Sequence, residues 1–176
     1  MKKIFILSLF ALGSLSVLAQ SCPDKKHPHA IDLGLPSGTK WACCNVGASK
    51  PQASGEYYGW GGVSRSKWDD SWQTPTKEQL EELKANCLAE WITIKGVNGY
   101  RFTSSNGQSI FLPAAGRFLV TYGGVGSYGF YRSLTLNPYI TGRFSYYMYF
   151  DSGTVKVNSD APFDVGFSIR YVRKNP

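Results

Sequence analysis

The sequence contains little histidine, methionine and cysteine, with two, two and four residues of these types among 176. Both histidines, His27 and His29, lie close to the N-terminus. A Ser-His-Asp or Cys-His site needs a histidine that the fold can bring beside its nucleophile. The position of the two histidines therefore argues against nucleophilic catalysis, and we expect no catalytic residues.

Metal-binding patterns are equally poor. His27 and His29 are separated by Pro28 and have no spaced partner cluster of the kind that zinc sites use. Asp69 and Asp70 follow Trp68 in a way that is superficially similar to a calcium-lectin motif, but the acidic proline loop that such a site also needs is missing. Calcium requires several converging oxygen ligands, so we expect neither a metal site nor a cofactor.

Long apolar runs are absent after the first 19 residues. Lys2 and Lys3 precede an apolar run, Ile4 to Leu12, and Val17-Leu18-Ala19 resembles a small-residue cleavage site. This order is typical of a secretory signal peptide and not of a membrane span. We therefore expect a signal peptide over 1–19, a tether over 20–29, one domain over 30–176, and a secreted or surface location.

A lipid anchor on Cys22 is an alternative that we disfavour, because Ala19 stands three residues before it where leucine is usual. The formal net charge is +7, but the basic residues of the domain are scattered. Scattered charge is typical of a solvated surface, so we do not expect a nucleic-acid partner.

The clearest secondary-structure signal is a helix that begins at Thr76. Thr76 and Gln79 have capping-box spacing, and Leu80 and Leu83 then fall on one face. The pattern predicts a helix that ends near Glu90. A disulfide between Cys44 and Cys87 and buried free thiols are equally compatible with the sequence.

Strands are predicted mainly in the second half. Two hairpins are indicated, one pairing 100–103 with 109–112 across Asn106-Gly107, and one pairing 146–150 with 154–157. A further strand is predicted over 167–172. Three glycines between 124 and 129 have dinucleotide-fingerprint spacing, but no helix fits after them, so this segment is interpreted as a loop.

Several motifs together resemble the Fibrobacter succinogenes major paralogous domain of secreted and surface proteins of gut bacteria. They lie in the same order as in that family, at 30–49, 55–61, 72–83, 96–100, 109–116, 146–153 and 166–173. The resemblance implies an α+β fold that is C-type-lectin-like, related to formylglycine-generating enzymes, with one main helix on a twisted, mainly antiparallel sheet and long loops. Those enzymes use late cysteines, and this chain has none after Cys87, so the resemblance does not extend to their activity.

The strand near residue 148 divides by alternation into two sets of side chains. We expect Met148 and Phe150 to face the core and Tyr147, Tyr149 and Asp151 to face outward. The predicted core consists of Trp41, Trp60, Leu80, Leu83, Phe111, Leu112, Met148, Phe150, Phe167 and Ile169. The alternative is that both faces are covered, because aromatic residues are also ordinary strand formers.

The outward set and the loop that follows predict a ligand-binding patch, since aromatic residues in adaptable polar loops are what paratopes use. The candidate binding residues are Tyr147, Tyr149, Asp151, Thr154, Asp160, Pro162, Phe163, Asp164 and Val165. This region also resembles the variable region of proteins that retroelements diversify, although Lys156 and Arg132 depart from the expected pattern. The sequence thus predicts a secreted or surface-displayed protein that binds a protein or glycan, and the alternative is a non-catalytic structural module of a bacterial cell envelope.

Overall fold

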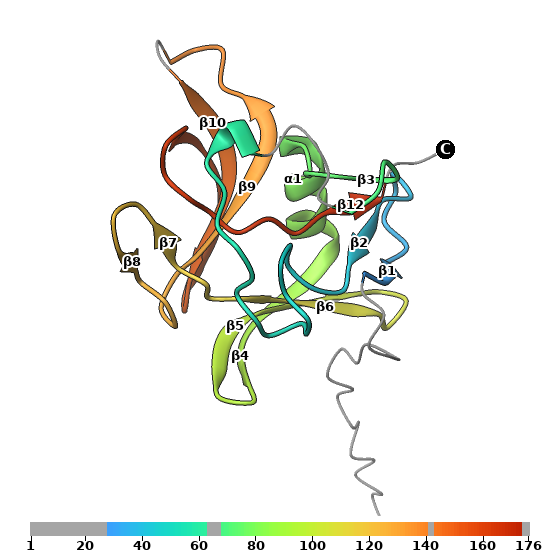
Figure 1. The fold of residues 1–176 in the computed structure, drawn as a ribbon. Coiled ribbons are helices and arrows are strands. Elements are labelled where there is room, and N and C mark those ends of the chain that lie inside the picture. Colours follow the sequence, from blue (N-terminus) through green and yellow to red (C-terminus); the bar gives the residue numbers. More distant parts are fainter. Residues whose placement is uncertain (1–27, 63–67, 141–142, 174–176) are drawn as a thin grey trace, which may run out of the picture.

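The structure, a computed structural model, describes residues 28–62, 68–140 and 143–173, and most of these residues lie in or between short antiparallel sheets (Figure 1). A four-stranded sheet has the order β1 (Ala30–Asp32), β2 (Lys40–Ala42), β12 (Val172–Arg173) and β3 (Trp72–Gln73). A three-stranded sheet consists of β4 (Cys87–Ile94), β5 (Val97–Ser104) and β6 (Ser109–Pro113). The predicted signal peptide and Cys22 lie outside the described residues.

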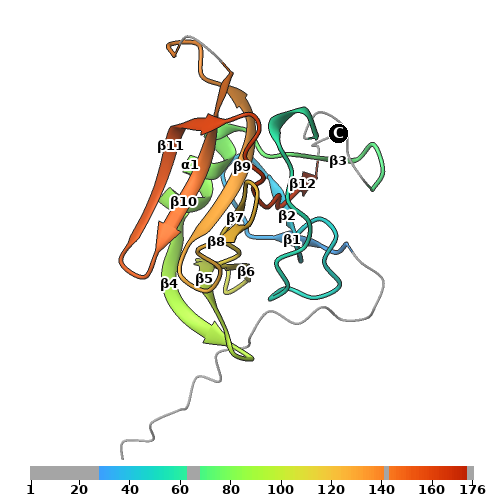
Figure 2. The ribbon, with the colours of Figure 1, turned by 60° about the vertical axis from the view of Figure 1, so that its left-hand side comes forward.

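The sheet that carries the candidate residues has the order β11 (Thr154–Pro162), β10 (Phe144–Asp151) and β9 (Gly129–Leu136). A small ribbon of β7 (Arg117–Phe118) and β8 (Tyr122–Gly123) stands beside it. In Figure 2 the helix α1 (Lys77–Asn86) lies behind the β9–β11 sheet. A short 3-10 helix, η1 (Trp60–Gly62), completes the regular elements of the described part.

This architecture corrects the predicted fold class. The described residues form a mostly β structure with several small antiparallel sheets, and a single helix on one main sheet of C-type-lectin type is not found. The strands β1, β2, β3 and β12 have only two or three residues each, and turns and long loops separate them. Hydrogen-bonded pairing is therefore interrupted, and the strands divide into separate sheets.

The helix begins as predicted and ends earlier. Thr76 is the N-cap, and its side chain and that of Gln79 form the reciprocal bonds of a capping box. The helix ends at Asn86, four residues before the predicted end, because Cys87–Ile94 forms β4. The β-branched and aromatic residues 91–94 favour a strand, and β4 pairs with β5 across the Lys95-Gly96 turn.

Both predicted hairpins are confirmed, as β5–β6 and β10–β11. The predicted strand over 167–172 is wrong, since only Val172 of that segment lies in a strand. Phe167 and Ser168 instead make isolated bridges to Tyr58 and Tyr131. Each neighbouring segment is joined to 167–168 by a single bridge, so no continuous ladder of strand hydrogen bonds forms.

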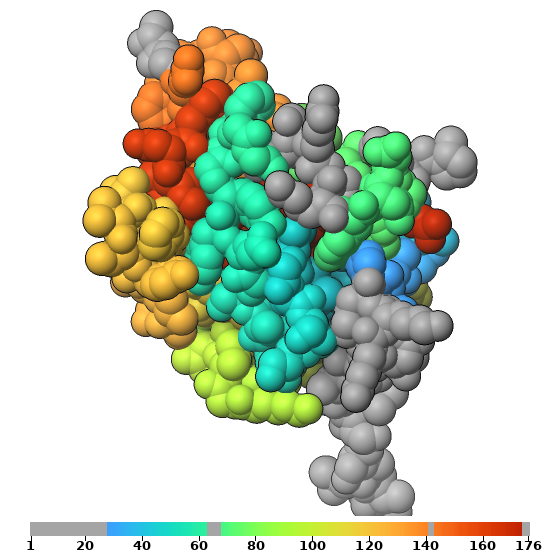
Figure 3. All heavy atoms as spheres, in the orientation of Figure 1, coloured from blue at the N-terminus to red at the C-terminus, as the bar shows by residue number. Residues whose placement is uncertain are grey.

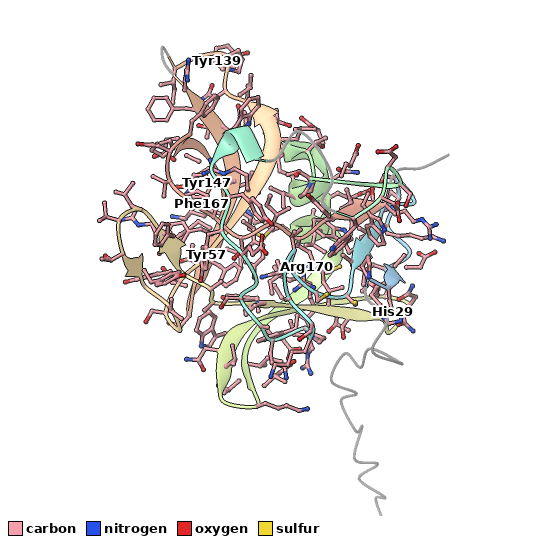
Figure 4. All side chains as sticks on the ribbon, in the orientation of Figure 1. His29, Tyr57, Tyr139, Tyr147, Phe167 and Arg170 are labelled. Atoms are coloured by element: carbon pink, nitrogen blue, oxygen red, sulfur yellow. The ribbon has the colours of Figure 1, made fainter. Side chains whose placement is uncertain are left out.

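The main hydrophobic core lies between α1, the β4–β6 sheet and the inner face of β10. All predicted core residues are buried except Trp60, which is half-buried and stacks on Phe163 with ring centroids 4.5 Å apart. Arg170 is also buried, at the centre of Figure 4, where its Nε donates to Asn45 and a terminal nitrogen donates to the carbonyl of Phe111, both at 2.8 Å. This cation ties the 42–51 segment to β6.

Candidate functional site

The strand β10 presents its two sets of side chains as the alternation predicts. Met148 and Phe150 are fully buried in the main core, which confirms the predicted strand register. Tyr147 points to the opposite face but is only 9% exposed, because it packs with Phe167 and Phe130 in a second, smaller cluster. Figure 4 shows Tyr147 and Phe167 side by side. The outer face is therefore covered at this point, as in the alternative interpretation of the strand.

Arg132 fixes the segment that covers this face. Its guanidinium donates to Ser145 Oγ at 3.0 Å, to the carbonyl of Pro162 at 3.2 Å and to the carbonyl of Val165. The same group lies 4.3 Å from the centre of the Phe167 ring. Burial lowers the pKa of Arg132 to about 10, so the side chain is still cationic at neutral pH. A buried charge bonded to main-chain carbonyls holds the 162–165 loop against the sheet.

The predicted binding residues do not form one exposed patch. Tyr147 and Val165 are buried, and Pro162 and Phe163 are half-buried. Asp160 and Asp164 are exposed. The physical reason for the correction is that the outward strand face and the following loop pack against each other, so they do not stand side by side in solvent.

Register separates the remaining residues into two groups. Asp151 pairs with Thr154 at the tip of the β10–β11 hairpin, whereas Pro162 pairs with Phe144 at the other end. Thr154 and Pro162 are therefore roughly 25 Å apart along β11, at about 3.3 Å per residue. Tyr149, Asp151 and Thr154 belong to the tip, and Asp160, Pro162, Phe163 and Asp164 belong to the far end. Their role in binding stays a prediction.

The strongest candidate site is a hollow near the tip group, which we call the aromatic hollow. Its volume is about 310 Å³. Its walls come from β7, β8, β9, β10 and the loop between β8 and β9, and the lining residues are Arg117, Gly123, Gly124, Tyr128, Phe130 and Tyr149. Concave surfaces with aromatic walls and a few polar groups are typical of ligand sites.

Three rings form the apolar wall of the aromatic hollow. Tyr128 and Tyr149 stack with their centroids 6.1 Å apart, and Phe130 meets Tyr149 at 5.4 Å in a T-shaped contact. Tyr128 is 42% exposed, while Phe130 and Tyr149 are half-buried. A ligand in the hollow would therefore contact aromatic surface from all three residues, with most of the exposed surface on Tyr128.

The hydroxyl of Tyr149 donates to Oδ2 of Asp151 at 2.8 Å. Partial burial of the ring, and then this hydrogen bond, raise the pKa of Tyr149 to about 12. Asp151 also accepts from the amide of Gly153, a bond that lowers the pKa of Asp151. The two side chains hold each other, so the tyrosine ring is fixed at the edge of the hollow.

Arg117 supplies the charge of the aromatic hollow. It is exposed, and its guanidinium lies 5.7 Å from the centre of the Phe130 ring. Within 28–62, 68–140 and 143–173, no carboxylate forms an ion pair with it. An arginine with free donors can bond to an anionic or carbonyl group in a planar, bidentate way.

Sequence reasoning missed most of this site. Residues 124–128 form a loop as predicted, whereas Gly123 ends β8 and Gly129 begins β9, so a strand and not a helix follows the glycines. The ribbon beside it exposes Leu119, Val120, Tyr122 and Val125 by 53–85%, and these residues would ordinarily be assigned to a core. The available signal was the density of aromatic residues around a glycine-rich loop, between Phe118 and Phe130.

Among the described residues, no disulfide joins Cys44 to Cys87, so the structure does not contain the predicted Cys44–Cys87 bridge. The Cys44 thiol donates to the carbonyl of Ala48, whereas Cys87 begins β4 and packs on the main core. The two side chains thus belong to different surroundings. In the described ranges, no three His, Cys, Asp or Glu side chains are grouped so that they could hold a metal ion.

Comparisons with protein-family models, with curated proteins and with solved structures find no match to this chain. The described part contains no helix with the length and apolarity that crossing a membrane requires. The geometry of the site therefore carries the functional argument.

Proposed function

We propose that this chain is a secreted or surface-displayed binding protein that holds a protein or glycan ligand in the aromatic hollow. The observation that carries the proposal is an open hollow with three aromatic rings beside Arg117, whose guanidinium has no carboxylate partner among the described residues. Aromatic and arginine side chains contribute disproportionately to binding at protein surfaces. The ribbon β7–β8 extends the contact surface, since its exposed apolar side chains adjoin the hollow.

Binding without catalysis fits the chemistry of the lining. The lining side chains that the structure describes provide one guanidinium and three rings, and they include no carboxylate, imidazole or thiol. General acid–base catalysis most often uses such groups at the reacting bond. The hydroxyl of Tyr149 is engaged by Asp151, which favours a positioning role for that ring.

An array experiment tests the proposal. The full chain would be screened against immobilised host glycoproteins, host glycans and bacterial surface polysaccharides. Tyr128→Ala and Arg117→Gln should each remove capture of the ligand so found, with little change in melting temperature because both residues are exposed. Tyr139→Ala is the control, since Tyr139 is 88% exposed and lies far from Tyr147 in Figure 4. Unchanged capture by both hollow variants would place the ligand elsewhere.

We further propose that the chain belongs to the Fibrobacter succinogenes major paralogous domain family, and that its C-terminal region is diversified by a retroelement. The order of the sequence motifs supports the first statement, and the resemblance of the C-terminal region to variable regions that retroelements diversify supports the second. The genomic sequence around the gene tests whether this region is diversified. A reverse transcriptase gene with a near-identical template repeat is expected nearby, and the absence of both would reject diversification while leaving ligand binding open.

A structural module of the cell envelope is the second candidate function. The observation that favours it is the burial of Tyr147 and Val165, two residues predicted to bind. If Tyr149→Ala and Phe163→Ala lower the melting temperature strongly and no array ligand is found, the aromatic residues serve the fold and this second function stands.

A further inference from the structure

A second hollow of about 410 Å³ lies on the other side of the loop that joins β8 to β9. We call it the basic hollow. Three loops line it: the segment 50–54, the β4–β5 turn with the residues that follow it, and residues 125–126. Figure 3 shows the segment near residue 50 beside the β4–β5 turn on one face of the molecule.

The charged side chains of the basic hollow have one sign. Lys50 and Lys95 line it and are exposed, and no aspartate or glutamate is among its described lining residues. In the described part of the chain, neither ammonium group forms an ion pair. Ser54 and Gln52 add a hydroxyl and an amide at the same surface. Unopposed ammonium groups beside neutral donors favour an anionic ligand.

Backbone geometry at Lys95 is a second, independent observation. Lys95 has φ of +50°, and it is the only residue other than glycine with positive φ in the described ranges. It occupies the first position of a two-residue turn whose second residue is Gly96, at φ +79°. Asparagine is the favoured residue at that first position, so a lysine there carries backbone strain. Strain of this kind is concentrated at functional sites.

The two hollows share one loop. Gly123 and Gly124 line the aromatic hollow, and Val125 and Gly126 line the basic hollow. Arg117 at one hollow and the two lysines at the other therefore place cations at both hollows that adjoin the segment 123–126. An extended anionic chain could contact both groups, whereas a compact ligand would fill one hollow only.

We propose that the basic hollow binds the sulfate or carboxylate groups of an anionic polysaccharide. Lys50 and Lys95 act as point charges toward these groups, and the side-chain amide of Gln52 donates to a neighbouring oxygen. The polysaccharide continues over Val125 and Gly126 toward Arg117. This last extension rests on the proposed function of the aromatic hollow, while binding in the basic hollow does not.

The first experiment measures binding of the full chain by fluorescence anisotropy at physiological ionic strength. The probes are a labelled heparin-derived octasaccharide, a labelled octamer of galacturonate and a labelled neutral malto-octaose. Binding of either anionic octamer is expected and should weaken as salt screens the charges, whereas the neutral octamer should not bind. The tighter of the two anionic probes identifies sulfate or carboxylate as the preferred group. Failure of both to bind would overturn the proposal.

The second experiment compares two double variants with the same change in net charge. Lys50→Gln/Lys95→Gln should weaken binding of the preferred octamer by about tenfold or more, because two charge-assisted contacts are lost. Lys84→Gln/Arg143→Gln removes two exposed cations that line neither hollow and should leave the affinity within about twofold. Equal weakening by both double variants would show diffuse attraction and overturn the site.

The third experiment separates function from folding at Lys95. Lys95→Asn should raise the melting temperature, because asparagine tolerates positive φ better, and should at the same time weaken octamer binding. A variant that melts earlier would contradict the strain argument, and one that binds as tightly as the parent would remove Lys95 from the site. Arg117→Gln should weaken binding of the octamer but not of a disaccharide of the same sugar, because only the octamer is long enough to reach Arg117. If Arg117→Gln leaves octamer binding unchanged, the extension into the aromatic hollow is wrong while binding in the basic hollow is retained.

Discussion

The two faces of the β9–β11 sheet are built from similar residues and packed in different ways. On the inner face, Tyr131, Met148 and Phe150 are at most 1% exposed and belong to the main core. On the outer face, Phe130 and Tyr149 keep part of their surface open, and Tyr147 is covered by Val165 and Phe167 from the segment after β11. The aromatic content of a sheet face therefore does not show whether that face is part of the core or open to a ligand. The segment that packs over the face determines which of the two it is.

The covering segments also differ in chemistry. The inner face packs against helix and strand side chains, where the Phe150 ring meets Tyr100 at 5.3 Å and Tyr131 at 5.7 Å. The outer face is closed by the 162–165 loop, which a buried cation holds through main-chain carbonyls. The inner face thus depends on apolar volume, whereas the outer face depends on hydrogen bonds to Arg132.

The largest expected effect is on the inner face. Phe150→Ala should lower the free energy of unfolding by about 3–5 kcal/mol, because it removes a fully buried ring and leaves a cavity. Urea denaturation measures this loss. Leu136→Ala on β9 is the control, since Leu136 is 46% exposed. A loss below about 1 kcal/mol for Phe150→Ala would mean that the two faces do not differ as described.

The next effect is on the cation of the outer face. Arg132→Leu should cost about 2–3 kcal/mol, because the carbonyls of Pro162 and Val165 lose charged donors in a buried place. Hydrogen exchange of the Gly166 amide should accelerate with it, as the loop loosens. Arg143→Leu, a change at an exposed arginine, should leave both measurements unchanged. If Arg132→Leu is neutral, the loop is held by its apolar contacts.

A smaller effect is expected at the hydroxyl of Tyr147, which accepts from Asn158 at 3.3 Å. Tyr147→Phe keeps the ring in its cluster and should cost about 0.5–1 kcal/mol in thermal or chemical denaturation. A cost as large as that of Phe150→Ala would indicate that the outer face is as tightly packed as the inner one.

The smallest effect concerns titration. The Tyr149 phenol should ionise near a pKa of 12, and Asp151→Asn should lower that value. Because the unfolded chain loses this proton near pH 10, any stabilisation by the raised pKa is present below pH 10 and is lost as pH rises toward 12. NMR of ring-labelled tyrosine, with Tyr149→Phe for assignment, measures the shift. An unchanged value in Asp151→Asn would exclude the carboxylate as a cause.

Local rules predicted the parts of this structure that depend on neighbouring residues. The capping box at Thr76, the hairpin at Asn106-Gly107 and the inward position of Met148 follow from spacing and alternation. The helix end was wrong because the strand-forming residues after Cys87 pair with β5, a partner that the helical pattern does not include. The sequence of one segment shows its local preference for helix or strand, but it does not show which strand the segment will pair with in the folded chain.

The candidate site was harder to predict than these elements. Alternation gives the side of β10 on which Tyr147 lies, but not that the segment after Pro162 folds back over it. Arg132 was noted as a departure from the family pattern, yet its bonds to Pro162 and Val165 join positions about thirty residues apart. The aromatic hollow likewise combines β7–β9 with β10, so no single stretch of sequence contains it.

The bonds made by Arg132 have a consequence for how this protein can change. The guanidinium binds carbonyl oxygens, which every residue possesses, so the anchor of the 162–165 loop does not depend on which side chains the loop carries. Asp160 in β11 and Asp164 in the loop are exposed and make none of these hydrogen bonds, although the charge of Asp164 favours the cationic form of Arg132. Substitutions at these two positions can therefore alter the surface chemistry while the chain path is kept. The clamp makes this loop a place where sequence can vary at low structural cost.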